Sequence, residues 1–171
     1  MHGSGATSSW VRRFADLVPA GGAVLDVAAG GGRHARFFLH LGHPVTTVDR
    51  DVSGLADLHR ADATILAADL EDGPWPLRDR RFAGVIVTNY LHRPLLPDIV
   101  ASVAPAGCLI YETFALGNER FGKPSNPDFL LRPGELLEAV RGRLTVVAYE
   151  NLEVAEPKPA LVQRIAAVAP T

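Results

Sequence analysis

The chain has 171 residues, of which 47% are hydrophobic, and this length suits one domain with a substantial core. Its formal net charge of -2 gives no electrostatic case for a nucleic-acid or membrane-surface partner, and we expect neither. The single cysteine excludes an intramolecular disulfide and a thiolate metal cluster, which fits a reducing cytoplasm. With no secretory leader pattern and no long apolar run, we expect a cytoplasmic protein with a flexible tail at residues 1–9 and a folded domain at 10–171.

Short apolar runs alternate with helical patterns along the chain. Ser8 and Ser9 are suitable caps for an amphipathic helix at 9–18. Further helices are expected at 32–41, near 95–103 and from Pro133, and strands at 23–27, 44–49, 63–69, 82–89, 108–114, 145–151 and 161–168. This alternation predicts a mostly parallel sheet with helices on both faces. Because residues 152–160 are too few for a crossover helix, the last strand is expected to run antiparallel to its neighbour.

The segment LDVAAGGGRHA, residues 25–35, joins an expected strand to an expected helix through consecutive glycines. Bare backbone at a helix N-terminus lets N–H groups approach a polar ligand, so the glycines suggest a nucleotide-like cofactor across the carboxyl ends of the strands. Asp49 ends the second strand, where a carboxylate can accept hydrogen bonds from both hydroxyls of a ribose, and Asp69 ends the third. The alternatives are a tight strand-to-helix connection and two aspartates that cap turns.

These features admit two cofactors, a nicotinamide dinucleotide and S-adenosylmethionine. Asp26 helps to separate them because it lies inside the first strand, ahead of the glycines. The dinucleotide fingerprint places its glycines directly after an apolar strand. Asp26 therefore favours S-adenosylmethionine.

The stretches VLDVAAGGGRHARFF, TTVDRD, AADLED and VIVTNYLHRPLL resemble class I S-adenosylmethionine-dependent methyltransferases, particularly the small tellurite-resistance-like group. The resemblance covers about residues 10–169. It implies a single-domain α/β fold, a Rossmann-like doubly wound sheet of about seven strands, mostly parallel with the last strand antiparallel. The family's first motif has an acid followed by glycines at alternate positions, which correspond here to Asp26, Ala28, Gly30 and Gly32. Ala28 departs from that pattern.

The resemblance also implies how the cofactor is held. The glycine loop would surround its methionine part, Asp49 would hold the ribose, and Asp69 with Leu70 would flank the adenine. Arg33 either neutralises the cofactor carboxylate or faces water, and His34 beside it is expected to pack. The complete predicted cofactor-binding set is Asp26, Ala28, Gly30, Gly32, Arg33, Asp49, Arg50, Asp69, Leu70 and Asn89.

The segment TNYLHRP, residues 88–94, follows the fourth strand and is expected beside the reacting centre. Tyr90 would shape the methyl pocket, and His92 would act as a general base, since histidine titrates near neutral pH. The alternative is that both side chains pack between a strand and a helix. Many amino-group methyltransferases have two prolines before an aromatic residue here. Their absence argues against methylation of a nucleobase or a glutamine nitrogen.

Residues 115–131 show neither a helix nor a strand period, and a loop of that length in a compact domain is often a functional lid. The candidate substrate contacts are Asn118, Phe121, Lys123, Asn126 and Phe129. The alternative is that residues 115–131 form a surface loop with no role in substrate binding. No metal site is expected, because no histidine or carboxylate pair stands at ligand spacing.

The sequence therefore predicts a methyltransferase that uses S-adenosylmethionine, releases S-adenosylhomocysteine, and acts on a small molecule such as a thiol, chalcogen oxyanion, carboxylate or amine. Three alternatives stay open: a non-catalytic S-adenosylmethionine-binding module, an NAD-binding oxidoreductase and an RNA methyltransferase. Neither the acceptor nor the oligomeric state can be inferred from the residues.

Overall fold

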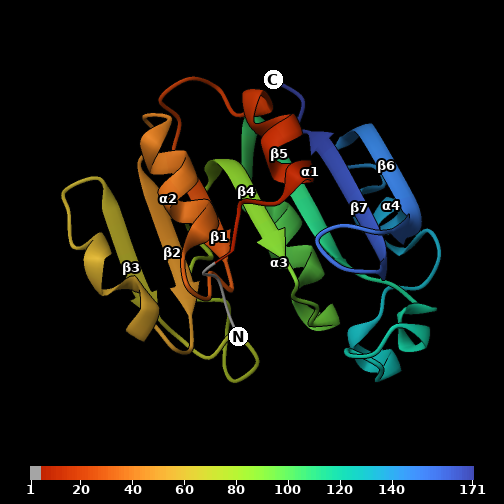
Figure 1. Cartoon of the computed structure of the whole chain (residues 1–171). Coiled ribbons are helices and arrows are strands. Elements are labelled where there is room, and N and C mark those ends of the chain that lie inside the picture. The colour runs from red at the N-terminus through yellow and green to blue at the C-terminus, as the bar shows by residue number, and fades with distance from the viewer. Residues whose placement is uncertain (1–4) are drawn as a thin grey trace.

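A computed structural model of the chain describes residues 5–171 (Figure 1). Its strands form a 7-stranded sheet in the order β3-β2-β1-β4-β5-β7-β6. The strands are β1 (Val24–Val27), β2 (Val45–Asp49), β3 (Ala63–Ala67), β4 (Phe82–Thr88), β5 (Val103–Phe114), β6 (Thr145–Val154) and β7 (Ala160–Val168). β7 is antiparallel to both β5 and β6, and the other neighbouring strands pair in parallel. The predicted Rossmann-like sheet with an antiparallel last strand is confirmed.

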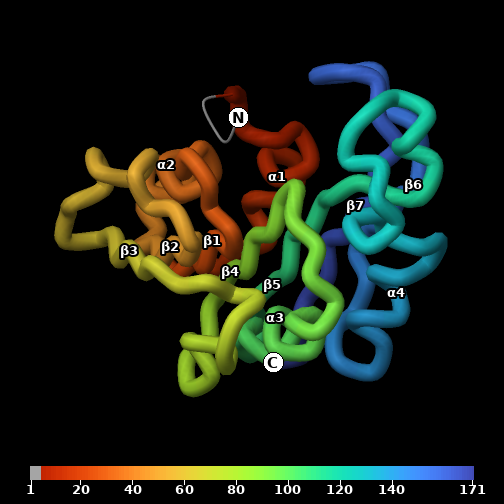
Figure 2. Tube along the Cα trace, turned by 90° about the horizontal axis from the view of Figure 1, so that it is seen from below, coloured from red at the N-terminus to blue at the C-terminus, as the bar shows by residue number. Residues whose placement is uncertain are grey.

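Helices cover both faces of this sheet, as the view along the strands shows (Figure 2). On one face lie α1 (Ser9–Phe14) and α2 (Arg33–His40), and on the other α3 (Leu96–Ala101) and α4 (Glu135–Val140). The connecting segments contain 3-10 helices η1 (Ala15–Leu17), η2 (Ser53–Leu58), η3 (Arg93–Leu95), η4 (Asn118–Arg120) and η5 (Pro127–Phe129).

Each face of the sheet has its own hydrophobic core. Successive side chains of a strand point to opposite faces, so Leu25 packs in the core with Ile99 of α3, while Val24 packs in the core with Phe38 of α2. All four side chains are buried. Burial on both faces explains why the central strands appear in the sequence as continuous apolar runs.

The start of β5 differs from the sequence expectation. Pro105 and Gly107 predicted a break with a strand from 108, but β5 begins at Val103, which pairs with Phe82. The register then shifts between Phe82 and Gly84, and Ala106 has a φ of 63°. A β-bulge accommodates proline because the hydrogen-bond ladder is interrupted there.

The strand order creates a crevice at the carboxyl ends of β1 and β4. After β1 the chain continues to β2 and β3 on one side and later returns to β4 on the other side. In open α/β sheets, ligands bind at this reversal of strand order. The fold therefore predicts a ligand site among the loops that follow β1, β2, β3 and β4.

Within residues 5–171, no helix combines the length and apolar character needed to cross a membrane.

Replacing Trp10 tests how strongly α1 is attached to the sheet. The Trp10 ring is buried, its Nε1–H donates to the carbonyl of Ile165 (3.1 Å), and the Arg164 guanidinium lies over the ring. Trp10→Ala is expected to lower the free energy of unfolding by about 3–5 kcal/mol in urea titrations. Leu41→Ala, at a side chain that is 48% exposed, should change it by less than about 0.5 kcal/mol. Equal small losses in both variants would mean that α1 is not anchored by this ring.

Candidate functional site

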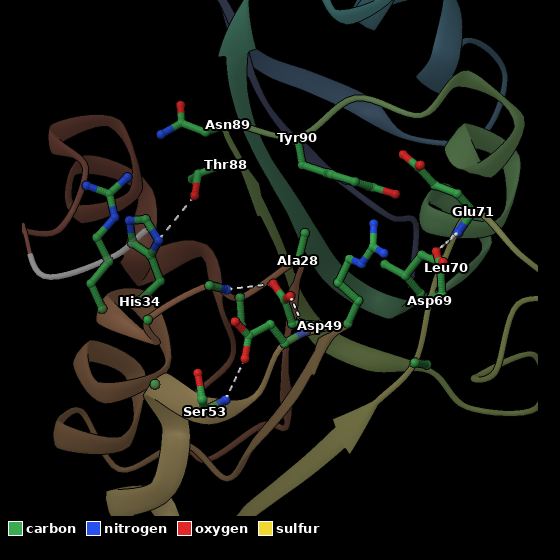
Figure 3. Close-up of a pocket in the computed structure, with 18 of the residues that line it drawn as sticks. Ala28, His34, Asp49, Ser53, Asp69, Leu70, Glu71, Thr88, Asn89 and Tyr90 are labelled. Carbon is green, nitrogen blue, oxygen red and sulfur yellow. Dashed lines mark hydrogen bonds between the residues drawn. The ribbon is translucent and has the colours of Figure 1, made fainter. Parts of the chain in front are cut away.

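A cavity of about 920 Å³ opens at the carboxyl edge of β1 to β4 (Figure 3). The predicted site residues that line it are Ala28, Gly30, Arg33, Asp49, Arg50, Asp69, Leu70, Asn89 and Tyr90. Asp26, Gly32, His92 and the predicted lid residues are not among the lining residues. Most of the predicted cofactor set thus surrounds one cavity, whereas the predicted general base and lid lie outside it.

The loop after β1 curves around the cavity through residues with positive φ. Ala28 has a φ of 53° and Gly30 of 56°, and a non-glycine residue in this region carries a steric cost. Gly32 has another role, since a Cβ there would lie 2.5 Å from Cδ2 of Leu55. The glycine at 32 therefore allows η2 to pack against the start of α2 rather than exposing backbone to a ligand.

Asp49, at the end of β2, fixes the shape of this loop. Its Oδ2 accepts a hydrogen bond from the backbone N–H of Gly30 (2.8 Å), and its Oδ1 accepts one from the N–H of Asp51 (3.0 Å). Each carboxylate oxygen has a further lone pair for a ligand hydroxyl. Asp69 is arranged in the same way at the end of β3, where its Oδ1 accepts the N–H of Glu71 (3.0 Å). Both aspartates cap turns and also line the cavity.

Asp26 lies beneath the cavity, buried beside the first turn of α2. Burial raises the pKa of this carboxyl to about 7, against the lowering effects of the Ala35 N–H and the Arg33 charge. Its Oδ2 has no hydrogen-bond partner among the described residues. Asp26 therefore exchanges its proton near neutral pH, unlike an exposed aspartate.

Arg33 ties the N-terminal segment to the cavity. Its Nη1 donates to the carbonyl of Ala6 (2.8 Å), and Gly5 is one of the lining residues. The part of the predicted tail within the described residues is thus in contact with the domain, while residues 1–4 lie outside them.

His34 belongs to the cavity wall, although the sequence favoured a packing role. It is buried, its Nε2 accepts the backbone N–H of Ser8 (3.1 Å), and its Nδ1 lies 3.3 Å from Oγ1 of Thr88. Burial, together with the Arg33 charge, lowers its pKa to about 3. The imidazole is therefore neutral at physiological pH. Nothing in the sequence distinguishes such a histidine from one in an ordinary core.

The residues after β4 form another wall. Asn89 adopts a φ of 54°, and its N–H donates to the carbonyl of Glu112 (2.9 Å). From there the Tyr90 ring extends toward Glu71, at the Asp69 end of the cavity (Figure 3). Burial raises the pKa of the Tyr90 hydroxyl, and the charge of Glu71 adds to this effect. Glu71 is a lining residue that the sequence analysis missed.

His92 is separated from the cavity by Glu71. Its side chain is 29% exposed, and its Nδ1 lies 3.7 Å from Oε1 of Glu71. Glu71 itself lines the cavity, so His92 stands behind a wall residue.

Residues 115–131 follow the carboxyl end of β5, at the same edge of the sheet but beside β7 (Figure 2). Asn118 is buried: its Nδ2 donates to the carbonyl of Pro124 (3.0 Å), and its Oδ1 accepts the N–H of Leu161 (3.0 Å). Asn126 accepts the N–H of Asp128 with its own Oδ1 (3.0 Å). Both amides thus bond to backbone groups of the protein, Asn126 within the loop and Asn118 both within it and to β7. Lys123 is exposed, as are Phe121 (40%) and Phe129 (50%).

No cluster of three or more histidine, cysteine, aspartate or glutamate side chains in the described part of the chain is arranged to hold a metal ion.

No family model matches the sequence, and no curated protein sequence matches it. Solved structures do match the fold. TehB from Haemophilus influenzae has a TM-score of 0.73 and 16% identity, covering 98% of this chain and 63% of TehB. A 1,6-didemethyltoxoflavin-N1-methyltransferase from Burkholderia thailandensis, with bound S-adenosylhomocysteine, has a TM-score of 0.67 and 21% identity over 95% of this chain and 79% of that one. The glycopeptide N-methyltransferase MtfA, also with S-adenosylhomocysteine, has a TM-score of 0.64 and 22% identity over 99% and 92%.

The chain has the class I methyltransferase fold. The fold implied by the sequence resemblance is thereby confirmed. At these identities the likeness concerns the methyltransferase fold alone.

Ala28→Gly tests the strain in the loop of the methyltransferase fold. Glycine removes the steric cost of a positive φ, so the free energy of unfolding is expected to rise by about 0.5–1 kcal/mol. Ala29→Gly is the matched control, because Ala29 is not among the residues with positive φ and should lose about 0.5–1 kcal/mol. Urea unfolding of both variants measures the difference. A loss in both would show that Ala28 is unstrained.

Asp26→Asn tests the buried carboxyl. The folded-state pKa of Asp26, about 7, lies above its value of 3.8 in the unfolded chain, so its favourable contribution is complete at low pH and is lost as the pH rises through 7. Asparagine does not ionise, so the stability of the variant does not fall in this way as the pH rises. Between about pH 4 and pH 8 its stability relative to the parent protein should therefore increase by on the order of 4 kcal/mol. Urea unfolding across this range measures the change, with exposed Asp79→Asn as control. Parallel pH curves for Asp26→Asn and the parent would contradict the assignment.

Proposed function

We propose that this chain is an S-adenosylmethionine-dependent methyltransferase that acts on a small-molecule acceptor. The observation that carries the proposal is the Asp49 carboxylate, hydrogen-bonded to Gly30 at the wall of a cavity at the switch point of the sheet. An acid at the end of β2 suits the two hydroxyls of a ribose. The similar structures that contain S-adenosylhomocysteine, both described as N-methyltransferases of small molecules or peptides, support the choice of cofactor.

The residues of the cavity fit this cofactor. Asp49 would accept the ribose hydroxyls, and Asp69, Leu70 and Tyr90 would surround the adenine. The methionine end would lie along Ala28 and Gly30, near Arg33. The unpartnered Oδ2 of Asp26 is a buried acceptor beside the first turn of α2, and a positively charged part of the cofactor would suit it. A cavity of about 920 Å³ lies within the range of small-molecule sites.

The bound cofactor supplies an activated methyl group, so the chain itself needs no covalent nucleophile. Its residues have to bind, orient and exclude water. Asn89 would border the reacting centre, whereas the Tyr90 ring extends to the Asp69 end of the cavity, where its raised pKa keeps the hydroxyl protonated.

Proton removal is needed only for an acceptor that enters protonated. We propose that His92 removes the proton from an acceptor that enters across Glu71, since His92 lies behind that residue. The exposed rings of Phe121 and Phe129 remain candidates for contact with a larger acceptor.

The acceptor classes consistent with this cavity are a thiol, a chalcogen oxyanion, a carboxylate and an amine. The near-neutral net charge supports a small molecule over a nucleic acid, and the single buried Cys108 supports a cytoplasmic location.

Calorimetric titration tests the proposal with S-adenosylmethionine, S-adenosylhomocysteine and NAD as ligands. Micromolar binding of the two adenosyl compounds is expected, with at least about a tenfold loss in Asp49→Asn, which weakens a charge-assisted contact to the ribose. Asp79→Asn removes the same charge from an exposed position and should leave binding unchanged. Binding of NAD alone would favour an oxidoreductase. Cofactor binding with no turnover across a panel of thiols, carboxylates, oxyanions and amines would favour a non-catalytic module.

A further inference from the structure

A partly buried hydrogen-bond relay connects the N-terminal segment to the cavity. Ser8, the N-cap of α1, accepts the N–H of Val11 (3.3 Å) with its Oγ and donates to Oε1 of Glu112 (2.8 Å). Its backbone N–H donates to Nε2 of His34 (3.1 Å), and Nδ1 of His34 meets Oγ1 of Thr88 (3.3 Å). Glu112 is held in turn by Arg164 (2.9 Å). The position of Ser8 is therefore fixed from several sides.

The relay has only one possible direction. A backbone N–H can only donate, so Nε2 of His34 must be the unprotonated acceptor. A neutral imidazole then carries its proton on Nδ1, and burial keeps the ring neutral. Nδ1–H therefore donates to Oγ1 of Thr88. The Thr88 hydroxyl proton finds no acceptor among residues 5–171, although the side chain lines the cavity.

The surroundings of Thr88 indicate the kind of group that would accept this proton. The same end of the cavity contains Arg33 and the N-terminus of the eight-residue helix α2, both of which favour negative charge. A ligand ammonium placed beside Arg33 would meet like charge and could not accept the Thr88 proton. A carboxylate oxygen would satisfy the free donor.

We propose that Thr88 donates a hydrogen bond to the carboxylate at the amino-acid end of the bound cofactor, and that His34 is the positioning residue that holds the Thr88 hydroxyl in this direction. The inference rests on the proposed function. It assigns the Ser8–His34–Thr88 relay a role in cofactor selection, and it makes Ser8 in the N-terminal segment part of the cofactor site.

Thr88→Val and Thr88→Ser test the proposal in the 171-residue chain. Valine preserves the shape but removes the hydroxyl, while serine retains the hydroxyl. The two probes are S-adenosylhomocysteine and 5′-methylthioadenosine, which lacks the amino-acid end. Thr88→Val should weaken S-adenosylhomocysteine by about tenfold or more and 5′-methylthioadenosine by less than about twofold, and Thr88→Ser should behave like the parent protein. Thr64→Val, on the exposed side of β3, controls for loss of a hydroxyl elsewhere.

His34→Asn and His34→Gln test the positioning role. The side-chain amide of Asn occupies roughly the position of Nδ1 and can still donate to Thr88. The longer Gln side chain places its amide roughly at the position of Nε2, from which it cannot donate to Thr88. His34→Asn should therefore keep more of the preference for S-adenosylhomocysteine over 5′-methylthioadenosine than His34→Gln, with circular dichroism confirming that both are folded.

The outcomes separate this inference from the proposed function. If the parent protein binds neither probe, the proposed function fails, and the inference fails with it. If the parent binds S-adenosylhomocysteine and Thr88→Val keeps the parent's affinity ratio for the two probes, the proposed function survives and the role of Thr88 is overturned.

Discussion

The hydrogen bond from the Gly30 backbone to the Asp49 carboxylate is the constraint on which the site depends. It connects the loop after β1 to the end of β2, two segments that are brought together only by the parallel pairing of their strands. Together with the bonds from the Gly32 N–H to the Ala29 carbonyl (2.9 Å) and from Arg36 to the Gly31 carbonyl, it orders residues 30–32, whose glycines lose more entropy on ordering than any other residue. The carboxylate therefore shapes the loop and keeps free lone pairs for a ligand. The same side chain thus fixes the loop and lines the cavity.

Much of the fold could be predicted because its causes are local or periodic. The apolar runs around Leu25 and Val85 indicated strands that are buried on both faces. The segment before β7 is too short for a crossover helix, so an antiparallel last strand could be predicted. The positions of Asp49 and Asp69 at the cavity were predictable for a similar reason, because the carboxyl ends of parallel strands meet at one edge of the sheet. The bulge in β5 was not predictable, since Pro105 signals a break but not how neighbouring strands adjust around it.

In the loop at 115–131, amino-acid composition alone does not predict which groups the side chains contact. Asparagine amides suit a ligand and a loop equally well, and Asn118 and Asn126 satisfy backbone groups of their own loop and of β7. Which partner an amide takes depends on contacts between segments distant in the chain. His34 shows the reverse case, because a histidine beside an arginine gave no sign that it would bridge Ser8 and Thr88.

The beginning of α2 shows how burial sets the charge around the cavity. Burial raises the pKa of Asp26 to about 7 and lowers that of His34 to about 3, so desolvation favours the neutral form of both. The Arg33 guanidinium acts on both groups and lies in the first turn of the same helix. The acidic groups Asp69 and Glu71 stand at the opposite end of the cavity, beside Tyr90. Carboxylates at that end disfavour the anionic end of an elongated ligand, whereas the end beside Arg33 favours it.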